Sequence, residues 1–277
     1  CRLALRDWEV FGVFRSHAVE IPGVVMVRAD LGSRESLLEL IRVVRPQAVI
    51  HAAALADANQ CQRNPSESLR FNVEGSVNLA RLCSDSSIPL VFTSTDLVFD
   101  GKSAPYCEDR PPSPINVYGE HKAMAEGAVL GIHPEVVVCR LPLMFGPAGP
   151  AAGSFIQPML DAMREGRHLR LFTDEFRTPA SVLDVARGLL TALSLPGGIL
   201  HLGGAERISR YDFGVLLGDV FGFARVRLTA CLRRDVPMAA PRPADVSLDS
   251  YKARRLGIVP ASLRDGLQTL RSSIQIV

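Results

Sequence analysis

Short apolar runs alternate with helical patterns along most of the 277-residue sequence, and this alternation is the feature that most constrains the fold. The runs are continuously apolar, which is typical of strands buried on both faces. Strand-like runs separated by helices predict an α/β fold in which helices cover both faces of a doubly wound parallel sheet. The expected strands lie at 8–14, 24–27, 47–51, 90–95 and 135–140.

Helix and boundary signals stand between and after these strands. Ser33 is an expected N-cap for the helix "RESLLELIRVV", and Pro65 is expected to open a second, longer helix. The stretch 142–153 is rich in proline and glycine and marks a candidate boundary. We therefore predict a larger domain at 1–141 and 179–203, and a smaller lobe at 142–178 and 204–277.

Composition narrows the class of protein. Hydrophobic residues make up 47% and charged residues 22% of the chain, as expected of a soluble globular protein. The net charge of +2 gives no reason to expect nucleic acid or a membrane as partner. The six cysteines include no C-x-x-C pair, and no histidine stands at metal-ligand spacing. We expect reduced thiols, a cytoplasmic location and no metal site, while a requirement for Mg²⁺ stays open.

Polar and small residues follow several of the predicted strands. In open parallel sheets, ligands bind at the carboxyl ends of the strands. Small residues at such an end let a ligand approach the backbone closely, although they also serve to pack a tight turn. The residues at these ends are Asp30, then Ala52, Ala53 and Ala54, then Thr95 and Asp96.

Tyr118 and Lys122 lie four residues apart in "VYGEHK", so they share one face of a predicted helix. An ammonium group beside a phenol stabilises phenolate and lowers the phenol pKa toward neutrality. Such a phenol is a usable proton donor or acceptor. The alternative is a solvated helix start after Pro114.

Four stretches together resemble one enzyme family: "RFNVEGSVNLA" (70–80), "STDLVFDG" (94–101), "YGEHKAMAE" (118–126) and "RPADVSLDSYKARRLG" (242–257). They are similar to the extended short-chain dehydrogenase/reductases, in particular the dTDP-4-dehydrorhamnose reductase branch. The resemblance implies a Rossmann-type NAD(P)-binding domain and a substrate-binding lobe. It also implies NADPH-dependent reduction of the 4-keto group of a nucleotide-linked deoxysugar. Whether the protein forms a homodimer stays open.

The resemblance assigns catalytic roles to three residues. Tyr118 would protonate the C4 oxygen as hydride arrives, and Lys122 would hold the nicotinamide ribose and tune the phenol. Thr95 would hydrogen-bond the same oxygen. Asn72 matches a recurrent helix asparagine of the superfamily, with a helix-surface amide as the alternative.

For the cofactor, the resemblance implies that Asp30 and Leu31 contact adenine and that Ala52–Ala54 line the binding segment. Arg15 follows the first strand, where NAD-selective relatives tend to carry an acid. An arginine there suits a 2′-phosphate, which favours NADPH, and NADH stays open. The alternative for Arg15 is a surface arginine in a loop.

For the substrate, the resemblance points to Thr95, Asp96, Leu143 and Arg177. Arg177 would grip the nucleotide diphosphate, or else form a salt bridge on the lobe surface. Leu97 stands where dehydratases carry a carboxylate, so the sequence favours a reductase over a dehydratase and leaves a 4-epimerase open. Leu97 and Leu143 replace aromatic residues that are usual in the rhamnose-forming enzymes, which leaves the sugar unidentified.

Two further expectations come from the resemblance. "CRLPLMFGP" (139–147) and "FRTP" (176–179) also resemble the regulatory β subunit of methionine adenosyltransferase, so a cofactor-binding regulatory role is the second hypothesis. The family's first strand and Gly-x-x-Gly-x-x-Gly turn have no counterpart in the sequence. We expect both ahead of "CRLALRD", which we interpret as the remainder of a first helix.

Overall fold

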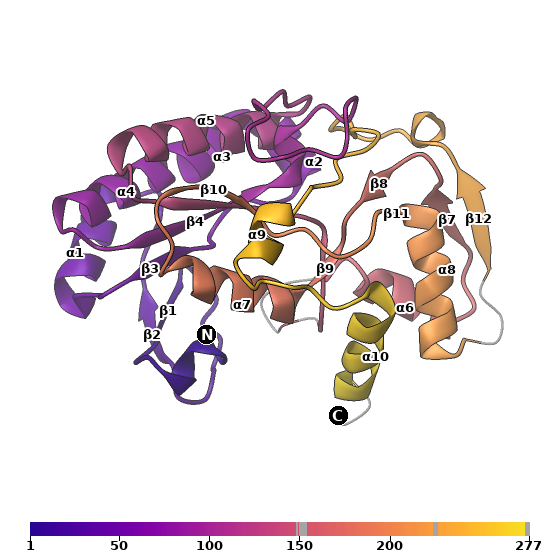
Figure 1. Cartoon of the computed structure of the whole chain (residues 1–277), viewed down its shortest axis with the longest axis horizontal. Coiled ribbons are helices and arrows are strands. Elements are labelled where there is room, and N and C mark those ends of the chain that lie inside the picture. The colour runs from indigo at the N-terminus through magenta and orange to yellow at the C-terminus, as the bar shows by residue number, and fades with distance from the viewer. Residues whose placement is uncertain (148, 150–153, 224–226, 275–277) are drawn as a thin grey trace.

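Parallel strands build the larger lobe, as the continuous apolar runs predicted (Figure 1). The computed structural model describes residues 1–147, 149, 154–223 and 227–274. Every residue of the two central strands is buried, which accounts for their uninterrupted apolar pattern. The four paired strands, all parallel, lie in the order β10 (Gly198–His201), β5 (Val137–Leu141), β4 (Leu90–Thr95) and β3 (Val49–His51).

The first two strands form a separate parallel pair. Strand β1 (Phe11–Phe14) pairs with β2 (Val25–Arg28), and within the described chain neither is paired with β3. The parallel strands of the larger lobe therefore lie in two sheets, one of two strands and one of four. The segment "CRLALRD" contains a single short 3₁₀ helix, η1 (Ala4–Arg6), and not a longer helix.

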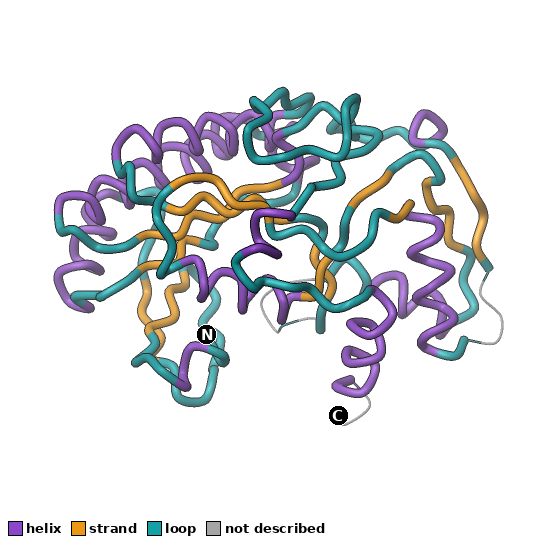
Figure 2. Tube along the Cα trace, viewed as in Figure 1, coloured by secondary structure: helices purple, strands orange, loops and turns teal. Residues whose placement is uncertain are grey.

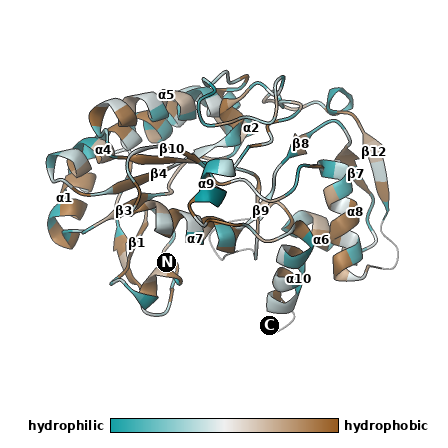
Figure 3. Ribbon diagram, in the orientation of Figure 1, coloured by the Kyte–Doolittle hydropathy of each residue, from teal (hydrophilic) through white to brown (hydrophobic). Residues whose placement is uncertain are grey.

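Two helical layers cover opposite faces of the four-stranded sheet, which confirms the doubly wound arrangement (Figure 2). On one face, Phe92 of β4 packs in the cluster formed with α1 (Arg34–Val44), α4 (Ser76–Asp85) and α5 (Val117–Ile132). On the other face, the neighbouring Val91 packs with α7 (Val182–Ala192) and α9 (Tyr251–Arg255). Figure 3 shows the hydrophobic colouring of β4 between these layers.

The helix starts follow the sequence signals only in part. Ser33 caps α1 as expected, because its hydroxyl accepts a hydrogen bond from Ser36 N. Pro65 does begin a helix, α3 (Pro65–Leu69), which is preceded by α2 (Ala58–Arg63). The chain then widens into a π-helical segment, η2 (Arg70–Gly75), before α4 begins. Such π segments often accompany functional sites.

The smaller lobe has its own apolar core, which includes Phe145, Phe213 and Leu267. The proposed domain boundaries stay a prediction, and residues 148 and 150–153 of the proline- and glycine-rich stretch lie outside the described residues. The elements from residue 142 onward that have not yet been named are β6 (Met144–Phe145), α6 (Gln157–Arg164), β7 (Leu169–Phe172), β8 (Phe176–Arg177), β9 (Ala180–Ser181), β11 (Ile208–Ser209), α8 (Arg210–Phe221), β12 (Leu228–Cys231), η4 (Arg233–Asp235) and α10 (Leu263–Ile274).

A buried ion pair fixes α5 against the sheet. Arg140 of β5 is fully buried and donates from Nη2 to Glu126 Oε2 of α5 at 2.8 Å. We expect Glu126→Ala to lower the free energy of unfolding by about 3–5 kcal/mol, because it leaves a buried guanidinium without its counter-charge. Urea unfolding of the two proteins measures this loss.

The matched control is Glu39→Ala, which removes the carboxylate of the exposed Arg42–Glu39 pair on α1. This variant should unfold at nearly the same urea concentration as the unaltered protein. Equal effects of the two substitutions would contradict a role for the buried pair in holding α5.

Candidate functional site

Thr95 ends β4 and caps the short 3₁₀ helix η3 (Asp96–Val98). Its hydroxyl accepts a hydrogen bond from Leu97 N at 3.2 Å and donates to Asp96 Oδ1 at 3.3 Å. The carboxyl end of a central strand is thus closed by a hydroxyl and a carboxylate, both buried. This is the sheet edge at which the sequence predicted a ligand.

Helix α5 brings Tyr118 to this strand end. Asn116 caps the helix by accepting from Gly119 N at 2.9 Å, and its amide donates to Pro241 O at 3.1 Å. A Cβ at residue 119 would lie 2.1 Å from Leu97 O, so only glycine lets the first turn of α5 lie this close to η3. Tyr118 and Lys122 are both buried on this helix, four residues apart as predicted.

The electrostatics of Tyr118 differ from the expectation. Burial raises the pKa of the phenol well above its ordinary value, and the charges of Cys61 and Asp96 add to this rise. Hydrogen bonding by Thr95 and the positive charge of Arg177 oppose it. The expected lowering by Lys122 is wrong for this structure, since the Lys122 Nζ lies over the Phe92 ring, 4.0 Å from its centroid.

The pKa of Lys122 is shifted in the direction that favours the neutral amine. Burial lowers its pKa from 10.5 to about 7, and the Glu126 carboxylate on the next helical turn opposes this shift. An amine with a pKa near neutrality gains or loses its proton at little cost. It can therefore respond to a charge that appears on a neighbouring group.

Arg177 extends from β8 of the smaller lobe to the strand end. Its Nη1 donates to both Asp96 oxygens, at 2.6 and 2.7 Å, and both side chains are buried. The predicted alternative of a surface salt bridge is therefore wrong. Burial raises the pKa of the Asp96 carboxyl, and Arg177 opposes this rise.

Two half-buried arginines, Arg210 and Arg242, lie near Glu175 and Arg177. Nε of Arg177 lies 3.9 Å from Glu175 Oε1, and the backbone amide of Arg210 donates to Glu175 O. Within the described chain, Arg177 Nε, Arg210 Nη1 and Arg242 Nε are buried without a hydrogen-bond partner. Burial lowers the pKa of Arg210 to about 10, opposed by Glu175, while Arg177 and Arg242 add to the lowering.

Arg210 and Arg242 were not predicted from the sequence as parts of this cluster. Arg242 opens the stretch 242–257, but only the fold shows that it lies near Arg177 and Arg210. The Arg210 guanidinium lies over the Phe155 ring, 4.6 Å from its centroid. Planar guanidinium groups with free N–H bonds are suited to carboxylate or phosphate oxygens.

The predicted cofactor segments lie at neighbouring strand ends. Ala52, Ala53 and Ala54 follow β3 as an exposed loop segment. Buried Asn72 holds the next residue, since Leu55 N donates to its Oδ1 at 2.8 Å and its Nδ2 donates to Leu55 O at 3.0 Å. Asn72 is therefore an anchor for this segment and not a helix-surface amide.

The turn after β2 is equally well defined. Asp30 Oδ1 accepts from Gly32 N at 2.9 Å, and the backbone amide of Asp30 donates to Ser36 Oγ. Leu31 lies against η2, where a Cβ on Gly75 would come within 2.6 Å of its Cγ. Arg15 follows β1 on the surface, and Leu143 lies half-buried between β5 and β6. The binding roles of these residues stay predictions.

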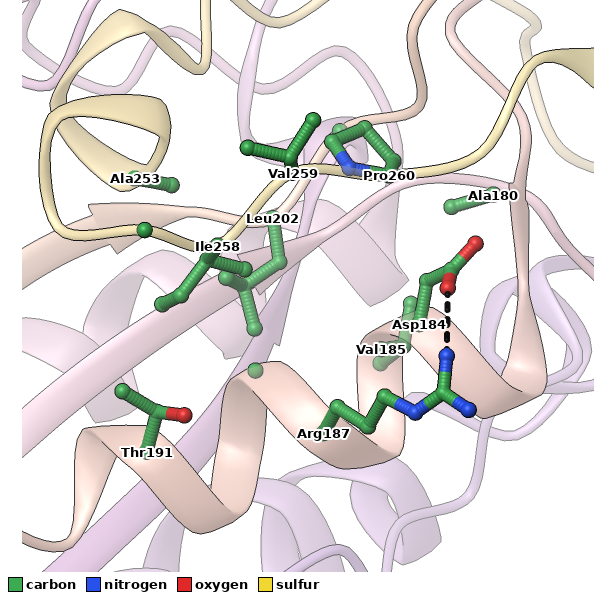
Figure 4. Close-up of a pocket in the computed structure, with 13 residues that line it drawn as sticks. Ala180, Asp184, Val185, Arg187, Thr191, Leu202, Ala253, Ile258, Val259 and Pro260 are labelled. Atoms are coloured by element: carbon green, nitrogen blue, oxygen red, sulfur yellow. Dashed lines mark hydrogen bonds and ion pairs between the residues drawn. The ribbon is translucent and has the colours of Figure 1, made fainter.

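Other features of the described chain lie apart from these residues. A hollow of about 120 Å³ lies beside α7 and is lined by Asp184, Arg187, Thr191 and mostly apolar side chains (Figure 4). The Asp184 carboxylate already accepts hydrogen bonds from the Ser181 hydroxyl and from Ala261 N, so it has partners within the protein. Among the described residues, no cluster of three His, Cys, Asp or Glu side chains could hold a metal, and no helix could cross a membrane.

The close approach at Gly119 can be tested by adding one methyl group. We expect Gly119→Ala to destabilise the fold by about 1–3 kcal/mol or more, because the new Cβ overlaps the Leu97 carbonyl. Gly127→Ala is the control on the same helix, where a Cβ meets nothing within 4 Å and should stabilise by about 0.5–1 kcal/mol. Thermal unfolding compares the two, and a neutral Gly119→Ala would refute the tight contact.

Burial of Lys122 predicts a pH-dependent stability. Between pH 10.5 and about 7 the unfolded chain binds a proton that the folded chain does not, so stability should fall as the pH falls through this window. Lys122→Met should remove this part of the pH dependence, whereas Lys102→Met, at an exposed position, should keep it. Urea unfolding across this pH range measures it, and identical slopes in all three proteins would contradict the shift.

Comparison with known proteins gives one family and several relatives. Residues 2–276 match the family described as RmlD substrate binding domain. The probable low-salt glycan biosynthesis reductase Agl14 of Haloferax volcanii is 30% identical over 251 residues, which cover 89% of this chain and 84% of that protein. Methionine adenosyltransferase 2 subunit beta of Xenopus laevis is 32% identical over 227 residues, which cover 79% and 67%.

Solved structures share the fold. A hypothetical dTDP-4-dehydrorhamnose reductase of Sulfolobus tokodaii superposes with a TM-score of 0.81 at 30% identity, covering 96% of this chain and 93% of that one. This likeness confirms the predicted Rossmann-type α/β architecture and the predicted resemblance.

Proposed function

Because the chain belongs to the RmlD substrate binding domain family, we propose that it reduces the 4-keto group of a nucleotide-linked deoxysugar, with NADPH as the hydride source. The observation that carries this proposal is the placement of Thr95 and Tyr118 at one strand end, with Lys122 on the same helix. Similarity to a reductase of Haloferax volcanii and to a dTDP-4-dehydrorhamnose reductase structure supports the reaction class.

Tyr118 is suited to act as the proton donor. Its raised pKa keeps the phenol protonated at neutral pH, so it carries the proton that a carbonyl oxygen needs when it becomes an alkoxide. The bound nicotinamide would supply the hydride to the carbonyl carbon. The Thr95 hydroxyl orients the same oxygen, and positioning of this kind lowers the barrier without a further chemical step.

The arginine cluster of Arg177, Arg210 and Arg242 would hold the diphosphate of the substrate. Arg177 Nε, Arg210 Nη1 and Arg242 Nε are buried atoms that make no hydrogen bond within the described chain. A diphosphate offers acceptor oxygens in the number and charge that such a cluster requires. Asp96 would keep Arg177 in place while Arg177 Nε stays available to the ligand.

The cofactor would lie along the strand ends after β1, β2 and β3. Asp30 and Leu31 would contact adenine, and the exposed segment Ala52–Ala54 would allow a close approach of the cofactor to the backbone. Arg15 would bind the 2′-phosphate, which favours NADPH over NADH.

The relationship to methionine adenosyltransferase 2 subunit beta supports a second candidate, a cofactor-binding regulatory subunit without turnover. The two candidates use the same Rossmann-type domain and differ in whether Tyr118 transfers a proton. Assays of NADPH oxidation with nucleotide-linked 4-keto sugars therefore distinguish them.

We expect Tyr118→Phe to reduce kcat by a factor of about 10² or more and to leave substrate affinity nearly unchanged, because the proton is needed only as charge develops on oxygen. Tyr251→Phe, at an exposed position on α9, is the control and should retain full activity. Stopped-flow NADPH oxidation and calorimetric substrate binding measure the two effects.

Unimpaired turnover in Tyr118→Phe would remove the phenol from the mechanism. Absence of turnover in the unaltered protein, together with retained NADPH binding, would favour the regulatory candidate.

A further inference from the structure

Two arginines from different elements share one phenyl ring next to the proposed adenine site. The guanidinium carbon of Arg15, after β1, lies 4.7 Å from the centroid of the Phe71 ring, and that of Arg70, in η2, lies 5.1 Å from it. Phe71 itself is buried, so the ring is a fixed platform for the two guanidinium groups. Arg70 and Phe71 open the stretch 70–80, but no role was assigned to either from the sequence.

The charge around this platform is unbalanced. Arg28 adds a third guanidinium, whose Nε donates to Arg15 O at 3.1 Å. Among these arginines, Arg70 is paired with the Asp30 carboxylate, whose Oδ2 lies 3.8 Å from Arg70 Nη2. The other oxygen, Asp30 Oδ1, accepts a hydrogen bond from Gly32 N. Two like charges above one ring repel each other, and one distant carboxylate offsets only part of this repulsion.

The position of Arg70 is constrained by the turn after β2. A Cβ on Gly32 would lie 2.7 Å from Arg70 Nε and 2.9 Å from its Nη2. The guanidinium therefore lies directly against the backbone that carries Asp30. Its place in the site is set by the π-helical segment η2, which starts at this residue.

We propose that Arg70 and Arg15 together bind the 2′-phosphate of the adenine nucleotide, with Phe71 as their shared platform. The proposal rests on the cofactor assigned under the proposed function and adds Arg70 as a determinant of cofactor choice. A phosphate monoester carries nearly two negative charges at neutral pH and accepts hydrogen bonds on three oxygens. Two guanidinium groups match that charge, and neither finds an equivalent partner in a ribose hydroxyl.

The test uses two small probes that differ by the 2′-phosphate, 2′,5′-ADP and 5′-AMP, titrated calorimetrically into the full chain. The unaltered protein should bind 2′,5′-ADP more tightly. Arg70→Ala should weaken the binding of 2′,5′-ADP by about 10- to 150-fold, because a charge-assisted contact is lost. It should change the affinity for 5′-AMP much less. Arg70→Lys keeps the charge without the planar fork and should recover part of the loss.

Arg63→Ala, an exposed arginine on α2, is the matched control and should bind both probes as the unaltered protein does. In the unaltered protein, raised salt should weaken the binding of 2′,5′-ADP more than the binding of 5′-AMP. In the Arg15→Ala, Arg70→Ala double variant, this difference between the two probes should disappear. The proposal is overturned by equal losses for both probes in Arg70→Ala, by no loss, or by no preference for 2′,5′-ADP in the unaltered protein.

Turnover of the unaltered protein with NADH, measured alongside, separates this proposal from the proposed function. A protein that reduces the keto sugar but does not distinguish the probes keeps the reductase assignment and loses the arginine pair. A protein that distinguishes the probes through Arg70 but shows no turnover keeps the arginine pair and loses the reductase assignment.

Discussion

The buried ion pair between Asp96 and Arg177 is the contact on which the arrangement of the site depends. It joins two residues 81 positions apart, one at the end of the central strand β4 and the other in the smaller lobe. Burying two charges is costly, and the short contacts of 2.6 and 2.7 Å are what offset that cost. Because Asp96 follows Thr95 directly, the pair fixes the smaller lobe against the residue that faces the proposed reaction.

The same pair sets the electrostatic surroundings of Tyr118. The negative charge of Asp96 raises the pKa of the phenol and the positive charge of Arg177 lowers it, so burial is left as the dominant influence. A substrate anion bound at Arg177 Nε would add negative charge on the lobe side of the pair. That charge would favour the protonated phenol further. Substrate bound at the proposed diphosphate site would therefore help to keep the proton on Tyr118.

Local patterns in the sequence predicted the strands, the Ser33 cap and the shared helix of Tyr118 and Lys122, because each depends on residues close together in the chain. The pKa directions could not be predicted in this way. They depend on burial, and on Lys122 lying over Phe92, a residue 30 positions away in the chain. Arg177 was singled out from the sequence, but Arg210 and Arg242 were not, since β8, the start of α8 and the segment at Arg242 meet only in the folded chain.

Burial acts on Tyr118 and Lys122 in opposite directions and thereby favours the neutral form of both. The phenol keeps its proton, and the pKa of the amine falls to about 7. A phenolate formed on Tyr118 would raise the proton affinity of the Lys122 amine one helical turn away, because opposite charges attract strongly in a site of low dielectric constant. Protonation of Lys122 would then accompany the loss of the Tyr118 proton. Burial therefore disfavours the charged form of each side chain in the resting pair.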